Sequence, residues 1–327
     1  MKTKKLKPAA KAILFVLAVA LLIGVPYILG VFDPLFEKSA AKGTEIVINT
    51  DTPATDSNAP VVDVIPTEKS KEGVIDLSLD EWIGWKPIVD ANGGVETKPG
   101  SIFDKLGLKV NIYMINDATN SSTALVKGSL DAAGYTVNRY AFLYDKFANA
   151  GVQVVMPYIT NSSAGGDGII AADGINNMKD LVGKSIAVPK FSEAQTLVLW
   201  LMAKDDTLTE ADKKNIKIVL VDTPEQAAQA FFSGQVQAAA TWQPFLSESK
   251  KYGGHILFDT KAAKNIILDG IVFRKDFVDA NQETVQKFIQ GALEAEALYT
   301  TEFQSIKATM PFVYPLTDNE IKDMTVD

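Results

Sequence analysis

The stretch that decides the fold is KGSLDAAGYTVNRY, residues 127–140, because SGQVQAAATWQPF, residues 233–245, repeats its design. Each has a glycine, an aliphatic residue two places later and a pair of alanines, and each then reaches a threonine beside aromatic residues. A glycine commonly closes a helix in this way. The two stretches therefore predict one unit, used twice: a helix, a turn, a strand of small residues and a polar loop.

The chain from residue 74 onward alternates short aliphatic runs with amphipathic stretches. Examples are the strand-like VIDLSL (74–79) and KSIAVP (184–189) and the helix-like SEAQTLVLWLMAK (192–204). This alternation predicts an α/β fold of two similar lobes, each a mostly parallel sheet flanked by helices. Ligands of such sheets bind beyond the carboxyl ends of the strands, where this chain has polar and aromatic loops. We therefore expect a ligand cleft between the lobes.

The composition excludes several classes of function. There is no cysteine and only one histidine, which rules out disulfides, thiolate catalysis and sites built on several histidines. His255 follows two glycines at a predicted strand start, so we expect a surface or packed residue there. Beyond residue 32 the chain has 27 basic and 40 acidic residues, since five of its 32 basic residues come earlier. That acidic body argues against nucleic-acid binding, and we expect no catalytic residue, no metal and no cofactor.

The N-terminus has the features of a membrane anchor. Residues 12–32 carry no charge and follow five lysines, and as a helix they would span roughly 30 Å, the thickness of a bilayer core. We therefore predict an N-terminal signal-anchor helix over residues 1–32, with the body on the far side of the membrane. Cleavage as a signal peptide stays open, because Ser39 and Ala41 have the required small-residue spacing. Residues 33–71 are rich in Thr, Pro, Asp and Ser, which predicts a disordered tether.

Five stretches carry a resemblance to a known family. They are KGSLDAAGYT, TNSSAGGDGIIA, INNMKDLVGKSIAVP, AFFSGQVQAAATWQPFLS and ILDGIVFRKDFV. Together they resemble the bacterial substrate-binding proteins of nitrate/taurine/sulfonate-type ABC importers. The resemblance implies a type II periplasmic-binding fold, a monomer, and partnership with the permease and ATPase subunits of an importer. It implies a location on the extracytoplasmic face of the bacterial cytoplasmic membrane, anchored there or free in the periplasm.

The same resemblance divides the body of the chain. We expect lobe 1 over residues 72–159, lobe 2 over 160–263, and a return segment of lobe 1 over 264–327. The final residues begin a capped helix with Thr317 and Glu320 and then stop, whereas the family continues further. We therefore expect the return segment to be truncated.

The loop TNSSAGGDG, residues 160–168, joins the two predicted lobes and offers small polar side chains and flexible glycines. Its candidate ligand contacts are Asn161, Ser162 and Asp167, the alternative being a plain connecting loop.

The segment PKFSEAQT, residues 189–196, places a strand end before a helix N-terminus. Lys190 and Ser192 there favour an anion, although Ser192 is also an ordinary N-cap. Glu193 either pairs with Lys190 or holds an ammonium group.

Aromatic residues at strand ends are further candidates. Trp82 and Trp85 follow the first strand, and Trp242 follows the second alanine pair. Aromatic rings commonly sandwich small ligands, the alternative being packing between lobes. Trp200, in a helical run, is expected to be a core residue.

The remaining candidates lie at other strand ends. Arg139 is suited to gripping a carboxylate, sulfonate or phosphate, or to forming a hinge salt bridge. The others are Thr119, Thr136, Asn138, Thr241 and Asp269. These residues provide both charge signs, so an anionic and a zwitterionic ligand both stay open.

The resulting hypothesis is capture of a small polar or anionic solute between two lobes, for import. Two alternatives remain: an anchored solute sensor, and an enzyme on the same fold, since some relatives make pyrimidine precursors. We expect no enzymatic activity, because the chain lacks cysteine and a glycine-rich phosphate motif.

Overall fold

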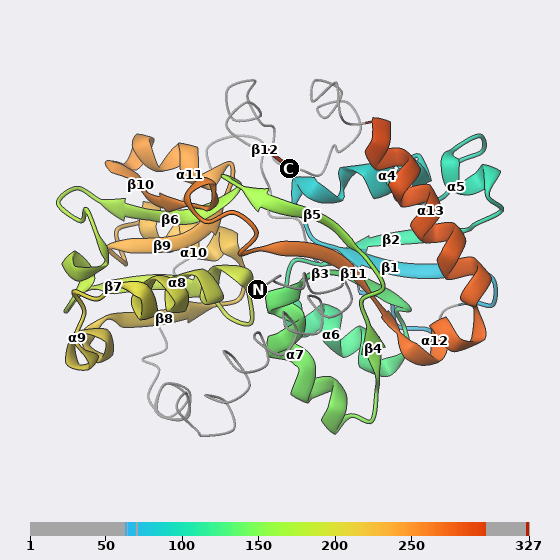
Figure 1. Cartoon of the computed structure of the whole chain (residues 1–327), viewed down its shortest axis with the longest axis horizontal. Helices are drawn as coiled ribbons and strands as arrows, with labels where there is room; N and C mark the ends of the chain where they lie inside the picture. The colour runs from blue at the N-terminus through green and yellow to red at the C-terminus, as the bar shows by residue number, and fades with distance from the viewer. Residues whose placement is uncertain (1–62, 64, 70, 299–324, 327) are drawn as a thin grey trace, which may run out of the picture. The chain divides into compact units, whose positions relative to one another are not determined.

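The computed structural model describes residues 63, 65–69, 71–298 and 325–326, which belong to one compact unit of the chain. They form two α/β lobes, each built around its own sheet (Figure 1). The predicted anchor and most of the predicted tether lie outside the described residues, as does the capped helix expected from Thr317. None of the described helices has the length and apolar character needed to cross a bilayer.

The sheet of lobe 1 has the strand order β12-β5-β11-β3-β1-β2, with β4 paired to β11. Its strands are β1 (Ile75–Leu79), β2 (Val110–Met114), β3 (Ala132–Thr136), β4 (Val154–Val155), β5 (Ile159–Ala164), β11 (Leu268–Arg274) and β12 (Thr325–Val326). Its helices are η2 (Ile83–Trp85), α4 (Lys86–Asn92), α5 (Ile102–Lys105), α6 (Ala118–Lys127), α7 (Val137–Asn149), α12 (Lys275–Ala280) and α13 (Gln282–Leu298). The long α13 packs on α4 and α5, where Phe103 and Phe288 stack with ring centroids 5.0 Å apart.

The sheet of lobe 2 has the strand order β10-β6-β9-β7-β8. Its strands are β6 (Asp167–Ala172), β7 (Ser185–Pro189), β8 (Lys217–Val221), β9 (Ala238–Trp242) and β10 (Gly254–Asp259). Its helical segments are η3 (Met178–Leu181), α8 (Glu193–Lys204), α9 (Glu210–Asn215), α10 (Pro224–Phe232), α11 (Phe245–Glu248), η4 (Ser249–Tyr252) and η5 (Thr260–Ala262).

The two similar sequence stretches occupy equivalent places in the two lobes. Gly128 ends α6 and Gly234 follows α10, both with a φ of 74°, a left-handed conformation that glycine adopts without strain. The strand that follows is β3 in lobe 1 and β9 in lobe 2. β3 pairs in parallel with β1 and antiparallel with β11. In the same way, β9 pairs in parallel with β7 and antiparallel with β6. The helix, turn and strand of the predicted unit therefore occur in both lobes, but β3 runs directly into α7 at Val137, so the predicted polar loop is absent from the first copy.

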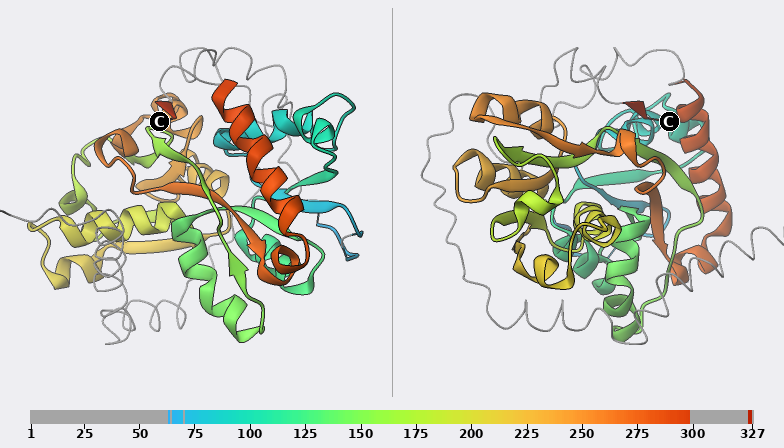
Figure 2. Two further views of the ribbon diagram at one scale, coloured as in Figure 1. Left: turned by 45° about the vertical axis from the view of Figure 1, so that its right-hand side comes forward. Right: turned by 60° about the vertical axis from the view of Figure 1, so that its left-hand side comes forward.

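Two connections join the lobes, and they lie side by side. The chain leaves lobe 1 through β5, crosses at Gly165 and Gly166, and enters β6. It returns through residues 260–267 into β11, which pairs antiparallel with β5 (Figure 2). β5 thus belongs to the first sheet, and β6, from Asp167, belongs to the second. In two-lobed proteins, hinge motion takes place in the segments that connect the lobes.

The sheets are mixed, so the prediction of mostly parallel sheets was wrong in this respect. Parallel pairing holds for β1 with β2 and β3, and for β7 with β8 and β9. The strands that connect the lobes, β5, β6, β10 and β11, pair antiparallel with their neighbours. Of these strands, β6 and β11 arrive from the opposite lobe instead of through a helix on the same sheet, and each therefore runs opposite to its neighbours.

One residue near the end of the predicted tether is attached to lobe 1. The Asp63 carboxylate accepts hydrogen bonds from the Asn116 backbone N–H at 2.8 Å and from the Asn120 side chain at 3.0 Å. These bonds attach Asp63 to the start of α6.

Candidate ligand-binding site

A cavity lies where the carboxyl ends of the strands of both lobes meet. Its lining residues are Asp80, Trp82, Trp85, Thr136, Asp167, Glu193, Trp242, Ile267 and Asp269. The cavity volume is about 10 Å³, which is room for about one water molecule. In this arrangement the lobes are therefore nearly closed on one another.

The end of β1 supplies one wall of the cavity. Asp80 directly follows this buried strand, and its Oδ1 accepts a hydrogen bond from Trp85 Nε1 at 2.7 Å and from the Trp82 backbone N–H at 3.3 Å. Gly84 lies between the two tryptophans, and a Cβ there would come within 2.4 Å of Trp82 Nε1. Asp80 and Gly84 together therefore fix how the two indole rings lie.

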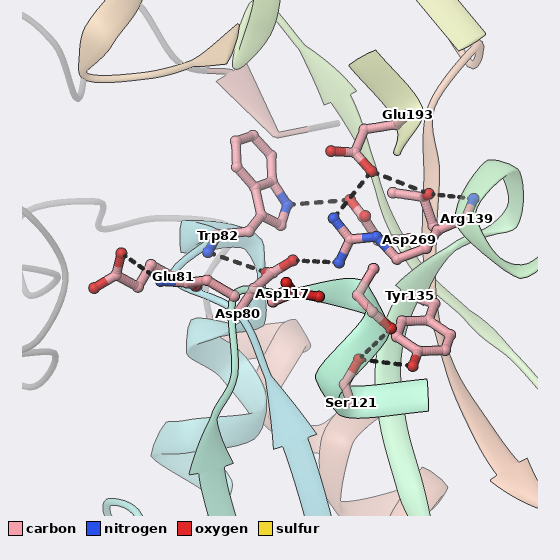
Figure 3. Close-up of polar contacts among 12 residues, drawn as sticks. Asp80, Glu81, Trp82, Asp117, Ser121, Tyr135, Arg139, Glu193 and Asp269 are labelled. Carbon is pink, nitrogen blue, oxygen red and sulfur yellow. Dashed lines mark hydrogen bonds and ion pairs between the residues drawn. The ribbon is translucent and has the colours of Figure 1, made fainter. Parts of the chain in front are cut away.

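Arg139 joins the two lobes beneath the cavity (Figure 3). It lies in the first turn of α7, which Thr136 caps by accepting a hydrogen bond from the Arg139 backbone N–H at 2.9 Å. Its guanidinium donates to Asp80 Oδ2 of lobe 1 at 2.8 Å and to Glu193 Oε2 of lobe 2 at 3.3 Å. All three side chains are at most 5% exposed, so this is a buried ion-pair network between the lobes.

Lobe 2 contributes residues from three elements. Asp167 is the first residue of β6, Trp242 is the last of β9, and Glu193 is the first of α8. Ser192 caps α8 by accepting a hydrogen bond from the Gln195 backbone N–H at 3.1 Å. The cap sets the start of the helix, and thereby places Glu193 toward Arg139.

Aromatic contact across the cleft complements the ion pairs. Trp82 of lobe 1 and Trp242 of lobe 2 stack with ring centroids 6.2 Å apart and an interplanar angle of 25°. Trp82 Nε1 donates to Asp269 Oδ2 at 3.1 Å, as Figure 3 shows. The ring of Trp82 also lies against Gly166, where a Cβ would come within 2.0 Å of it.

The cavity has an acidic lining. Four carboxylates line it, and among the described residues no lysine, arginine or histidine does so. Burial and the neighbouring Glu193 raise the pKa of Asp167 to about 8. Burial and the nearby Asp167 raise the pKa of Asp269 well above its usual range. Burial opposes the charge of Arg139, but Glu193 and Asp80 outweigh it and raise its pKa, so Arg139 stays protonated.

The raised pKa of Asp167 predicts a pH dependence of stability. A carboxyl group whose pKa is higher in the folded chain binds its proton more tightly there. The stability that protonated Asp167 contributes is fully present below the unfolded pKa of 3.8, and it is lost as the pH rises through about 8. For chain dialysed free of small molecules, we expect the free energy of unfolding to fall between about pH 5 and pH 8.

Urea denaturation across this pH range measures the effect. Asp167→Asn should flatten the slope, whereas Asp279→Asn, at an exposed carboxyl of α12, should leave it unchanged. If the free energy of unfolding falls with pH equally steeply in the parent chain and in Asp167→Asn, Asp167 is not the group responsible.

The structure brings about half of the predicted site residues together around the cavity. They are Trp82, Trp85, Thr136, Asp167, Glu193, Trp242 and Asp269. The predicted residues outside its lining are Thr119, Asn138, Arg139, Asn161, Ser162, Lys190, Ser192 and Thr241.

Most of the residues outside the lining have other contacts. Lys190 pairs with Asp222 and not with Glu193. Thr241 donates to the Pro224 backbone carbonyl at 2.9 Å, and Ser192 donates to that of Pro189 at 2.6 Å. Asn161 donates to the Gly84 carbonyl at 3.2 Å.

The other three candidates lie at element ends or in the hinge. Ser162 lies opposite Leu268 in the β5–β11 pair. Thr119 and Asn138 are partly buried residues near the starts of α6 and α7. All three therefore flank the site without lining it.

Two lining residues were not predicted. Asp80 directly follows the strand VIDLSL, the same kind of position that favoured Trp82, and this signal was sufficient to find it. Ile267 lies in the return connection, where one apolar residue among several has no distinguishing pattern. The described residues contain no group of three His, Cys, Asp or Glu side chains arranged to hold a metal ion.

Residues 82–310 match the sequence model of the NMT1-like family. The chain belongs to the NMT1-like family. A Brucella abortus (strain 2308) protein that carries the name of a binding protein is 26% identical over 218 residues, which cover 65% of this chain and 64% of that protein. The alignment thus spans less than two thirds of the relative's length. The taurine-binding periplasmic protein of Escherichia coli (strain K12) is 27% identical over 136 residues, 41% of each chain.

Solved structures show the fold of this NMT1-like protein. The periplasmic aliphatic sulphonate-binding protein of Escherichia coli superimposes with a TM-score of 0.58 at 18% identity, covering 79% of this chain and 86% of that one. The periplasmic nitrate-binding protein of Synechocystis PCC 6803 superimposes with a TM-score of 0.56 at 14% identity. The superposition covers 73% of this chain and 64% of that one. The two-lobed periplasmic-binding-protein-like fold is therefore confirmed, as is the resemblance to the nitrate/taurine/sulfonate type.

Proposed function

We propose that this protein is an extracytoplasmic solute-binding protein that captures a small polar molecule between its lobes and delivers it to an ABC importer. The observation that carries the proposal is the cavity itself, which side chains from both lobes enclose. A molecule that contacts both lobes favours the arrangement in which the lobes meet, so binding and hinge closure are linked.

The contacts between the lobes support this mechanism. The Arg139–Glu193 ion pair and the Trp82–Trp242 stack each have one member in each lobe. Both contacts break if the lobes separate about the β5–β11 hinge. Solute contacts made in the cavity then add to these and shift the population toward the closed arrangement.

The relatives support binding as the activity. The proteins to which the chain is similar carry names of binding proteins, among them taurine-binding and sulphonate-binding ones. On this basis the partners of the chain are the permease and ATPase subunits of an importer, and the anchored or periplasmic location follows. The bound molecule leaves chemically unchanged.

Native mass spectrometry of the gently purified full-length chain tests this function. We expect a bound small molecule, and we expect its return to the dialysed chain to raise the melting temperature. Trp200→Phe is a suitable control, because Trp200 packs on Phe258 in lobe 2 and does not line the cavity. Recovery of a chemically altered molecule would point to an enzyme. The proposal would be contradicted if no bound molecule were found and no added solute raised the melting temperature.

A further inference from the structure

The charge of the cavity lining is far from balanced. Asp80, Asp167, Glu193 and Asp269 line it, and Arg139 forms ion pairs with Asp80 and Glu193. With Asp167 and Asp269 protonated the cluster has a formal charge of −1, and with all four carboxyl groups ionised it has −3. Burying such a charge without compensation is strongly unfavourable.

Glu193 has an oxygen without a partner. Its Oε2 accepts hydrogen bonds from Arg139 and, at 3.4 Å, from the Thr136 hydroxyl. Its Oε1 is buried and has no hydrogen-bond partner within the protein, although Glu193 lines the cavity and is only 2% exposed. Buried carboxylate oxygens are almost always satisfied, so this one is suited to accept a hydrogen bond from a bound molecule.

Most of the Arg139 guanidinium is already engaged, although its Nε is buried without a hydrogen-bond partner. Two of its nitrogens already donate to Asp80 and Glu193, and the guanidinium itself does not line the cavity. An anionic ligand would have to displace one of these carboxylates and would add negative charge to a site that already has an excess. The charge therefore opposes sulfonates, nitrate and phosphates.

The aromatic walls favour positive charge as well. Trp82 and Trp242 line the cavity from opposite lobes, and hydrogen bonds to Asp269 and Asp80 fix the indoles of Trp82 and Trp85. The face of an indole ring attracts cations, most strongly where water is excluded. Carboxylates and tryptophan faces together are a common environment for ammonium groups.

We propose that the ligand of this cavity is a small organic cation, with a positively charged nitrogen that Glu193, Asp167 and Asp269 hold and Trp82 and Trp242 enclose. This proposal rests on the proposed function and specifies its substrate class. An organic cation fits better than a metal ion, because the described carboxylates do not converge as a metal site and the tryptophans offer no metal ligand. Because the cavity is about 10 Å³ and Trp82 stacks on Trp242, the two rings must move apart to admit the ligand.

The protonation of the site provides an independent readout. Asp167 faces Glu193, Asp80, Asp269 and Arg139, and burial raises its pKa to about 8. A bound cation favours ionised carboxylates, so its binding releases protons at neutral pH and tightens as the pH rises toward about 8. An anion would instead favour the protonated groups.

Isothermal titration calorimetry on the dialysed full-length chain tests the proposal. The probes are choline, guanidinium and 4-aminopyridinium as cations, methanesulfonate and nitrate as anions, taurine as a zwitterion, and Mg²⁺ and Zn²⁺ as metal ions. We expect an organic cation to bind most tightly, and to release protons when two buffers of different ionisation enthalpy are compared. Proton release is measured on the unaltered chain, so it does not depend on any variant folding.

Matched variants locate the binding. Glu193→Gln and Asp269→Asn keep the shape of each side chain and remove its charge, so each should weaken cation binding about 10- to 100-fold. Glu248→Gln removes a carboxylate outside the cavity, paired with Lys251, and should change affinity less than about twofold.

Each other outcome overturns the proposal in a distinguishable way. If an anion, taurine or a metal ion binds more tightly than the organic cations, the proposed ligand class is wrong. The proposed function of solute capture would not be affected. If no probe binds, the molecule extracted from natively purified chain decides: a net positive charge supports the proposal, and a neutral or negative molecule refutes it. If no molecule is extracted either, the result contradicts both the proposed function and the proposed ligand class.

Discussion

Replacing Arg139 with alanine is expected to lower the free energy of unfolding by about 3–5 kcal/mol, the usual cost of breaking a buried ion pair from one side. Arg139 donates to Asp80 and Glu193, and all three side chains are almost completely buried. Without the guanidinium, two carboxylates remain in the interior with no counter-charge. Urea denaturation at neutral pH measures the loss.

Two variants make the result interpretable. Lys251→Ala removes an exposed partner of Glu248, and its cost should stay below about 1 kcal/mol. Arg139→Lys keeps the charge but cannot donate to both carboxylates in a planar fork, so its stability should lie between those of the parent chain and Arg139→Ala. Equal stability of Arg139→Ala and Lys251→Ala would contradict the network described here.

Gly166→Ala is expected to weaken ligand binding by about 5- to 150-fold, the equivalent of about 1–3 kcal/mol of overpacking. Gly166 lies at the first crossing between the lobes, and an added Cβ would come within 2.0 Å of Trp82 Cη2. The ring and the crossing must then move apart, which opposes closure around the ligand. Calorimetry with the best-binding solute measures the change.

A rescue experiment separates this effect from general damage. Trp82→Phe removes the ring atoms that the alanine would meet, so the Gly166→Ala change should cost much less in the Trp82→Phe background. Such non-additivity is the expected sign of direct contact. Equal costs in both backgrounds would show that Gly166 acts through something other than Trp82.

Local patterns in the sequence were sufficient for the architecture. The glycine and alanine-pair stretches predicted equivalent elements in two lobes, because helix ends and tightly packed strands depend on nearby residues. Residues 152–159 form two strands and not one, because β4 ends at Val155 and β5 begins at Ile159. Pro157 explains the break, since proline lacks the N–H that a strand ladder needs.

The partners of charged residues were harder to predict, because they depend on which lobes meet. Lys190 and Glu193 are three residues apart, which suggested a pair. In the structure Glu193 faces Arg139 of the other lobe, and Lys190 turns to Asp222. Trp200 was expected in the core but is half-buried, with Lys204 4.6 Å from its ring centroid. The pairing of Glu193 with Arg139 is a long-range contact that no short-range pattern contains, whereas Lys204 follows Trp200 by about one turn of α8.

The central claim is that a solute closes the two lobes, and a distance between them tests it most directly. The chain has no cysteine, so Lys105→Cys in lobe 1 and Lys214→Cys in lobe 2, both at exposed positions, give two unique sites for spin labels. The distance distribution is measured by pulsed electron resonance on dialysed chain, before and after the natively extracted small molecule is returned. We predict that the solute narrows the distribution and shortens its mean, and that Gly166→Ala reduces this response. A distribution that the solute leaves unchanged would contradict capture by closure.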